Sequence, residues 1–209
     1  MPGWDVAGAF FVTALLLGIC PGPDIIFVLA QSALYGARAG IWTTFGLATG
    51  LCVQTLIVAL GVAVLFQLWP LAFFLLKVCG ALWLCYLAFL AFRAKPDSMA
   101  TGRRNDLPSH VALYRRGIIM NITNPKVSIF FLAFLPQFED PARGSLALQT
   151  VVLGLLFILA TLIVFCSVAC LGGQLANLLN KTPQMQLWLN RVAGTVFLAL
   201  AMALLFLDM

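Results

Sequence analysis

Six long apolar stretches constrain what this chain can fold into more than any other feature. A transmembrane helix needs roughly 20 consecutive apolar residues. Stretches of about that length or longer occupy residues 7–34, 41–65, 71–92, 116–136, 146–171 and 188–207. Only 9% of the residues are charged, against about 25% in soluble domains. The stretches are continuously apolar, whereas membrane barrel strands alternate apolar and polar residues. The sequence therefore predicts an all-α integral membrane protein with six transmembrane helices.

Two of these stretches contain helix-breaking residues and a charge near mid-membrane. The first break carries Asp24 and the second carries Lys126. Broken helices at membrane depth are tolerated only where the freed backbone faces protein or a wet cavity. A charge at that depth is costly and by default marks a functional site. The residues at the two breaks are Pro21, Gly22, Pro23 and Asp24, and Asn121, Asn124, Pro125 and Lys126.

The two breaks occupy corresponding places in two halves of the chain. In residues 23–29 and again in residues 125–132, a proline is followed by a charge and then by apolar residues. Each half has three predicted spans, and an odd number turns the second half upside down relative to the first, as in many transporters. We expect a single transmembrane domain, 1–209, made of two inverted three-helix repeats at about 1–92 and 116–209. A cytoplasmic linker at about 93–115 joins them.

The distribution of Lys and Arg predicts the orientation, because positively charged loops stay in the cytoplasm. The 93–115 linker contains five of these residues and Arg116 follows it directly, whereas the opposite side of the predicted bundle has only Lys77 and Arg143. The linker is therefore expected in the cytoplasm and both termini in the periplasm. The start of the chain lacks the pattern of a signal peptide, so the first stretch is expected to be a retained helix.

The chemistry of the breaks predicts a site for a zwitterion. A helix that restarts in mid-membrane exposes N–H groups and the positive end of its dipole, which favours anions. Asn124 is a suitable N-cap for the second restart. Lys126 would attract a carboxylate and Asp24 an ammonium group, so an α-amino acid fits the pair. Asp24 is also the candidate for proton coupling, because no other acidic residue lies deep in a predicted span. The candidate substrate-binding residues are Pro21, Gly22, Pro23, Asp24, Asn121, Asn124, Pro125, Lys126 and Gln54.

Structural roles for the same residues stay open. Asp24 could cap the first restart, with Lys126 as its salt-bridge partner and no ligand between them. Gln54 could line the transport path or only pack. Gly46 and Gly50 form a GxxxG pattern, which is more typical of close helix packing than of ligand contact. Packing is also the expected role of a stripe on the fifth span and of two residues on the sixth: Thr150, Gly154 and Thr161, and Asn190 and Gly194.

The six cysteines lie within apolar stretches, so no disulfide framework is predicted. Cys20 touches the first break, which raises the alternative of a membrane thiol relay. The second break has no cysteine to complete such a relay. The single His is far from any Cys in the sequence, so no metal site is expected. No cofactor or enzymatic activity is expected either. The net positive charge does not imply a nucleic-acid partner, because the basic residues are gathered in loops.

The two break motifs, with their flanking residues, resemble the signatures of the LysE/RhtB family of amino-acid exporters. The first motif is Cys20-Pro21-Gly22-Pro23-Asp24, followed by residues 31–32, 36–40 and 46–50. The second is the 121–126 break followed by residues 130–138. The resemblance covers the whole chain in length and number of spans. It implies six helices in a bacterial inner membrane and export of an amino acid against a proton gradient, with Pro21 to Asp24 and Asn124 to Lys126 as core positions.

The expected function is therefore proton-coupled antiport of a neutral amino acid of the homoserine, threonine or leucine class. The expected partners are that amino acid, protons and the lipid bilayer, and association into a homo-oligomer stays open. The alternative is a membrane component that does not itself transport, such as a thiol relay or a partner subunit.

Overall fold

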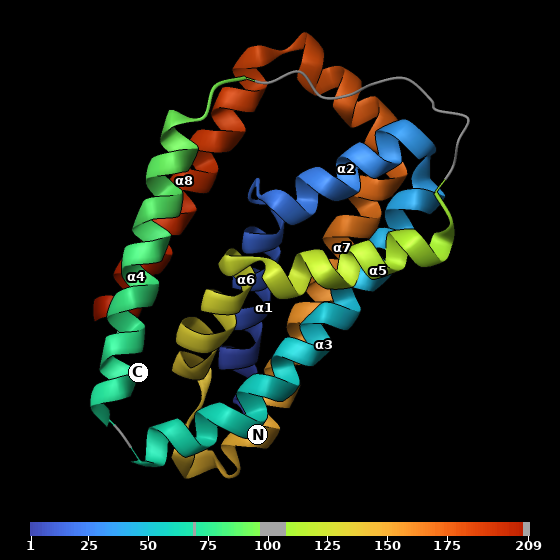
Figure 1. Ribbon diagram of the computed structural model, residues 1–209. Coiled ribbons are helices and arrows are strands. Elements are labelled where there is room, and N and C mark those ends of the chain that lie inside the picture. Colours follow the sequence, from blue (N-terminus) through green and yellow to red (C-terminus); the bar gives the residue numbers. More distant parts are fainter. Residues whose placement is uncertain (69, 97–107, 207–209) are drawn as a thin grey trace.

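The computed structural model describes residues 1–68, 70–96 and 108–206 (Figure 1). Within these ranges the chain is helical and contains no strand, which confirms the all-α prediction. The first half comprises α1 (Trp4–Ile19), α2 (Pro23–Tyr35), α3 (Ala37–Leu68) and α4 (Pro70–Arg93). The second half comprises α5 (His110–Thr123), α6 (Pro125–Ile129), the short helices η1 (Phe130–Phe134), η2 (Leu135–Phe138) and η3 (Pro141–Arg143), α7 (Leu146–Lys181) and α8 (Pro183–Phe206).

Both predicted helix breaks are confirmed. α1 and α2 meet at an angle of 57°, and α5 meets the 125–138 segment at 50°. In the described residues four helices are long and apolar enough to span a membrane, or up to six if each bent pair is one span. Each half contains a broken pair, then a long helix, then a helix of 24 residues. The same order of elements in both halves is compatible with the inverted repeat, which stays a prediction.

Three predicted boundaries are wrong. The linker is shorter than predicted, because α5 begins at His110 rather than at residue 116. Residues 97–107 of that linker lie outside the described residues. The sixth helix begins at Pro183 rather than at residue 188. The fifth helix was expected to end before Gly172, yet α7 continues to Lys181 without interruption.

Packing against α2 explains why α7 continues through Gly172 and Gly173. A Cβ atom at Gly172 would collide with the side chain of Ser32 on α2, so this glycine permits close contact rather than ending the helix. Beyond it, Ala176 and Leu179 are buried and cluster with Leu29, while the intervening polar side chains are exposed. Residues 174–181 are therefore the amphipathic end of this helix.

The helices form two groups (Figure 1). α4 packs mainly along α8, and this pair stands beside a larger bundle made of α1, α2, α3, α5 and α7. In the bundle, α3 lies between α5 and α7. The close packing predicted for the GxxxG pattern is confirmed on α3, since a Cβ at Gly50 would lie 2.7 Å from the Cβ of Asn121.

An aromatic cluster fills the bundle between the breaks and the turn that follows η2. Phe130 and Phe131 follow the second break, and their rings lie 5.2 and 5.1 Å from that of Phe157 on α7. The ring of Phe10 on α1 lies 5.1 Å from that of Phe138 at the end of η2. Buried aromatic rings contribute large apolar areas and prefer such tilted or edge contacts. This end of the molecule is therefore solidly packed.

Candidate functional site at the helix breaks

Lys126 connects the two breaks. Its ammonium group donates to the carbonyl oxygens of Leu17 (3.0 Å) and Cys20 (3.1 Å), at the end of α1. The last carbonyls of a helix have no partner within the helix and carry the negative end of its dipole. A lysine from the second half of the chain therefore caps the broken helix of the first half.

The surroundings of Lys126 hold its side chain in this position. Only 8% of Lys126 is exposed. At Gly22 a Cβ atom would lie 3.2 Å from the Lys126 nitrogen, so any larger residue there would crowd the ammonium group. The ring of Phe197 on α8 lies 5.1 Å from the same nitrogen, which adds a cation–π attraction. The carbonyls and the ring together offset part of the cost of burying this charge.

Asp24 lies in the first turn of α2 and is 6% exposed. One of its carboxylate oxygens accepts a hydrogen bond of 3.4 Å from the side chain of Asn121 on α5. The other oxygen has no hydrogen-bond partner, and neither has the amide nitrogen of the nearby Asn124. Buried polar groups are normally paired. The Asp24 carboxylate and the Asn124 amide thus lie close together at the breaks, without a hydrogen bond of good geometry between them.

The two helix restarts differ in their capping. Asn124 accepts from the backbone N–H of Lys126 at 3.0 Å, so the predicted N-cap of the second restart is confirmed. No side chain caps the start of α2. Asp24 therefore does not serve as the cap that the structural alternative required. The first turn of α2, with Lys126 nearby, is the better place for an anion.

Asp24 and Lys126 do not pair with each other. Asp24 accepts its hydrogen bond from Asn121, and Lys126 donates to α1. No ion pair joins the two side chains in the part of the chain that the structure describes. The structural salt bridge that the sequence left open is absent there. Each charge is instead held by the opposite half of the chain, so the breaks form one constellation rather than two.

A small cavity, called here the break cavity, lies between the breaks and one face of α7. It measures about 30 Å³, enough for one or two water molecules but far too small for an amino acid. The breaks contribute Cys20, Gly22, Asp24, Asn121, Asn124 and Lys126 to its wall, and α7 contributes Phe157, Thr161 and Phe165. The site is therefore contracted in this conformation.

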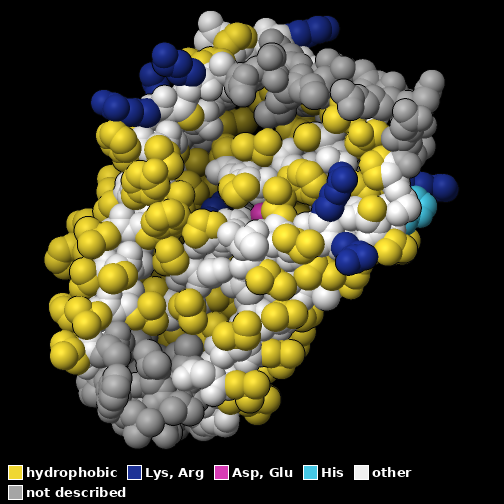
Figure 2. All heavy atoms as spheres, in the orientation of Figure 1, with side chains coloured by type: hydrophobic (Ala, Val, Ile, Leu, Met, Phe, Trp, Pro, Cys, Tyr) yellow, Lys and Arg dark blue, Asp and Glu magenta, His cyan; other side chains and the backbone are white. Residues whose placement is uncertain are grey.

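Two larger hollows lie on the other side of Lys126 and are together called the vestibule. They measure about 300 and 590 Å³ and share Pro21, Ile26, Ala94 and Asn190. Figure 2 shows this face of the molecule hollowed beside the α4–α8 pair. Gly22, Asn124 and Lys126 line both the break cavity and the smaller hollow. These three residues thus separate the vestibule from the break cavity.

A family model described as LysE type translocator matches residues 15–207 of the chain. The chain belongs to this family. The match spans both breaks, the end of α1 and the helices from α2 to α8. This finding confirms the family resemblance that the two break motifs indicated.

Individual relatives agree with this assignment. An uncharacterized membrane protein of Vibrio cholerae is 31% identical over 196 residues, covering 94% of each chain. The homoserine/homoserine lactone efflux proteins of Salmonella typhimurium and Salmonella typhi are each 32% identical over 190 residues, covering 91% of each chain. No solved structure matches this LysE-family chain.

The structure brings nearly all the predicted site residues of this translocator together. The residues at the breaks line the break cavity, the vestibule or both: Pro21, Gly22, Pro23, Asp24, Asn121, Asn124, Pro125 and Lys126. Gln54 lines none of these spaces. Its amide donates to the backbone oxygen of Asn121 at 3.0 Å and to the side-chain oxygen at 3.4 Å. Gln54 therefore positions Asn121, which in turn holds Asp24.

Sequence reasoning missed the wall that α7 and α8 provide. Phe157, Thr161 and Phe165 follow one another at intervals of four residues, so they share one helical face, and all three line the break cavity. Thr161 was assigned to packing together with Gly154, which does pack against Thr55. The four-residue spacing was visible in the sequence. The proximity of this face to the breaks was not.

A half-buried acidic group lies outside the spans, just after η2. Glu139 contacts the hydroxyl of Thr150 near the start of α7. Burial raises the pKa of Glu139 from 4.5 to about 7, against a smaller lowering effect of the Thr150 hydrogen bond. Glu139 therefore titrates near neutral pH.

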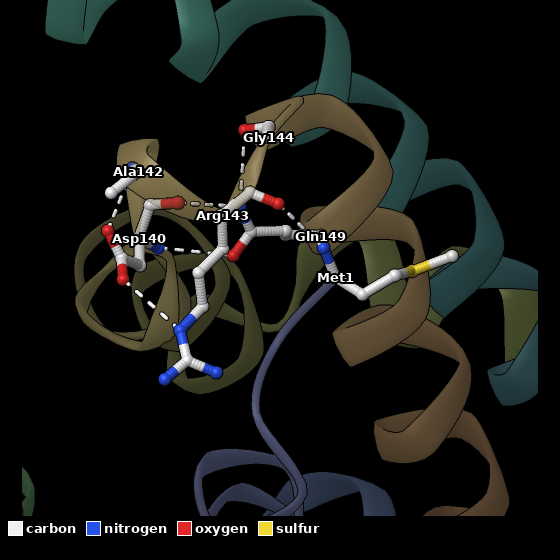
Figure 3. Close-up of polar contacts among 6 residues, drawn as sticks. All are labelled: Met1, Asp140, Ala142, Arg143, Gly144 and Gln149. Atoms are coloured by element: carbon white, nitrogen blue, oxygen red, sulfur yellow. Dashed lines mark hydrogen bonds and ion pairs between the residues drawn. The ribbon is translucent and has the colours of Figure 1, made fainter.

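The turn that carries Glu139 is fixed by hydrogen bonds (Figure 3). The fully buried side chain of Gln149 accepts from the Asp140 N–H at 3.1 Å and donates to the Asp140 carbonyl at 2.8 Å. The N-terminal amine of Met1 donates to the carbonyl of Arg143 at 2.9 Å. The start of the chain and the 139–145 turn are thus at the same end of the molecule.

Proposed function

We propose that the protein is a secondary transporter that exports a small neutral amino acid across the bacterial inner membrane in exchange for protons. The observation that carries this proposal is the pair of buried, opposite charges at the two breaks, neither of which neutralises the other. A zwitterion supplies the missing partner for each. The LysE-type family and the efflux relatives support export rather than another membrane function.

Binding is proposed to exchange protein contacts for substrate contacts. The substrate carboxylate takes the place of the Leu17 and Cys20 carbonyls on the Lys126 ammonium group, with the uncapped first turn of α2 nearby. The substrate ammonium takes the unpaired oxygen of Asp24. Both steps need the break cavity to widen, because about 30 Å³ cannot hold the ligand.

The vestibule supports loading from the cytoplasm. It is lined by Ala94 and Lys95 next to the linker and by Met185 and Gln186 at the start of α8. The linker carries more basic residues than any other loop and is proposed to be cytoplasmic. The opposite end is filled by the aromatic cluster around Phe130. This conformation therefore corresponds to a transporter open towards the cytoplasm and closed towards the periplasm.

Asp24 is proposed to couple export to protons. When Asp24 binds a proton from the periplasm, it loses the charge that holds the substrate ammonium, and the substrate is released outward. The proton then leaves towards the cytoplasm as the empty site returns. In this scheme one carboxylate serves the substrate and the proton in turn.

Asp24→Asn tests this coupling. The amide keeps the shape of the side chain but cannot ionise, so we expect the variant protein in proteoliposomes to lose substrate movement driven by an imposed pH gradient. Exchange of labelled substrate without a gradient should decline less. Asp5→Asn is the matched control, because Asp5 is exposed at the start of α1. Wild-type rates of gradient-driven transport in Asp24→Asn would show that the proton travels elsewhere.

A further inference from the structure

One threonine inside a helix uses its hydroxyl group unlike the others. Threonine hydroxyls within helices commonly donate to the carbonyl four residues earlier. Eight helical threonines in the described residues do so, namely Thr13, Thr43, Thr44, Thr49, Thr55, Thr123, Thr150 and Thr195. The hydroxyl of Thr161 on α7 makes no hydrogen bond to any described residue. Its hydroxyl is thus not engaged by its own helix.

Thr161 lies where an unengaged hydroxyl can meet a ligand. It is 6% exposed and lines the break cavity. Asp24 and Asn124 each have one polar side-chain atom that is fully enclosed and has no hydrogen-bond partner among the described residues. The Thr161 oxygen is not such an atom. The hydroxyl therefore keeps some accessible surface, on a residue that lines the cavity. Phe157 and Phe165 flank it one turn away on either side and line the same cavity.

The three walls of the cavity match the three parts of an amino acid. Asp24 offers a partner for an ammonium group and Lys126 for a carboxylate. The α7 wall then faces the remaining part, the side chain. On this wall Thr161 is a hydrogen-bonding group between two rings that limit the space.

We propose that Thr161 is a specificity-determining residue that hydrogen-bonds an oxygen atom on the substrate side chain. This inference rests on the proposed export function and adds to it the group that selects among neutral amino acids. Phe157 and Phe165 pack against the carbon atoms of that side chain and limit its size. The preferred substrate is a small amino acid with a side-chain hydroxyl or carbonyl oxygen.

The test compares substrates that differ only by a hydroxyl and a methyl group. Threonine and valine form one such pair, and homoserine and norvaline form another. Exchange of each labelled amino acid is measured in proteoliposomes without a pH gradient, so that proton coupling does not affect the measured rates. The readout is the ratio of kcat/KM values within a pair, because a change in overall folding or insertion cancels in that ratio.

Thr161→Val should reduce the preference for the hydroxyl-bearing member by about threefold to tenfold, the worth of one neutral hydrogen bond. Thr161→Ser keeps the hydroxyl and should keep the wild-type ratio. Thr161→Ala is a second variant without the hydroxyl and should behave as Thr161→Val, even if the valine fits poorly. Thr195→Val is the matched control, because Thr195 is exposed on α8 and bonds its own helix.

The outcomes separate this inference from the function on which it rests. If the wild-type protein exchanges no amino acid, the proposed function fails and the inference fails with it. If the wild-type protein exchanges amino acids but Thr161→Val and Thr161→Ala keep its ratios, only the role of Thr161 is overturned. A ratio that changes equally in Thr161→Ser would also overturn it, because the hydroxyl would not be the selecting group.

Discussion

Glu139 accepts a hydrogen bond from the hydroxyl group of Thr150. The Thr150 hydroxyl is within reach of the Leu146 carbonyl at 3.1 Å and of the Glu139 carboxyl group. A hydroxyl has one proton to donate. Thr150 is the donor in both contacts, so its one proton is shared between the Leu146 carbonyl and the Glu139 carboxyl group. This hydrogen bond lowers the pKa of Glu139, but burial raises it by more, to about 7.

The raised pKa of Glu139 predicts how the stability of the folded protein changes with pH. The folded protein holds the Glu139 proton up to about pH 7, whereas the unfolded chain loses it near 4.5. The stabilising contribution is thus complete below pH 4.5 and is lost as the pH rises to about 7. The thermal unfolding midpoint of the purified wild-type protein should fall over this range relative to that of Glu139→Gln, which cannot titrate.

Two features of the region isolate Glu139 in this measurement. The nearest ionisable groups on its turn, Asp140 and Arg143, are bonded to each other at 3.3 Å on the exposed side. The first turns of α7 contain no ionisable residue, and neither does η2; Asp5 and the N-terminus lie on the α1 side. A constant difference between wild type and Glu139→Gln from pH 4.5 to 8 would contradict the account.

At the scale of residues, the sequence was sufficient to find the charges but not their partners. Asp24 and Lys126 stand out locally, because each is a charge next to helix breakers inside an apolar stretch. The contacts of Lys126 with Leu17 and Cys20 join residues more than a hundred positions apart. A local sequence pattern cannot show that two residues so far apart in the chain are in contact. Thr161 was missed for the same reason, since only its position opposite the breaks distinguishes it from a packing residue.

At the scale of helices, the two neighbouring glycines of α7 make different contacts. A Cβ atom at Gly172 would collide with Ser32 of α2, whereas a Cβ at Gly173 would meet nothing within 4 Å. We expect Gly172→Ala to destabilise the protein by about 1–3 kcal/mol, the usual cost of overpacking. Gly173→Ala should be neutral or stabilising by up to about 1 kcal/mol, because alanine favours a helix.

Thermal unfolding of both glycine variants in the same detergent measures this difference. Because α2 carries Asp24, Gly172→Ala should also slow substrate exchange, and Gly173→Ala should not. Equal midpoints and equal exchange rates for the two variants would mean that the close contact between α2 and α7 is unimportant.

The helix ends show which local signals failed. The breaks before Pro23 and Pro125 were predictable, since proline lacks the N–H that a continuous helix needs and fits the first helical position. The glycine pair at 172–173 carries a weaker signal, about 1 kcal/mol per residue. Burial of Ala176 and Leu179 against α2 overrides it. Tertiary packing therefore determines the length of α7. The local sequence does not reveal that packing, so the end of the helix could not be predicted from it.

At the scale of the whole molecule, the distribution of charge predicts the orientation. On the face shown in Figure 2, the basic side chains gather over the half nearer the linker. The linker should be cytoplasmic and the 139–145 turn periplasmic. Single cysteines at Ser98, outside the described residues, and at Ser145, the N-cap of α7, can be introduced into a cysteine-free variant and labelled with an impermeant thiol reagent. Labelling of intact cells should occur at position 145 alone, and labelling at position 98 alone would reverse the orientation.

The central claim is that the charges at the two breaks bind the two charged ends of one substrate. Three ligands test it: the transported amino acid, its α-hydroxy acid, which lacks the ammonium, and its amide, which lacks the carboxylate. Each should bind to the purified protein with an affinity that its thermal stabilisation reports. A hydrogen bond to a charged group is worth about tenfold to a hundredfold in affinity, so the wild-type protein should prefer the amino acid over both analogues by about that factor.

The decisive measurement is the affinity of these three ligands for Asp24→Asn and Lys126→Gln, with Lys181→Gln, an exposed site, as the control. Asp24→Asn should lose the preference for the amino acid over the hydroxy acid and keep the preference over the amide. Lys126→Gln should show the reverse pattern, and Lys181→Gln should match the wild type. If both break variants instead weaken all three ligands by the same factor, the two charges do not contact the substrate and the account is contradicted.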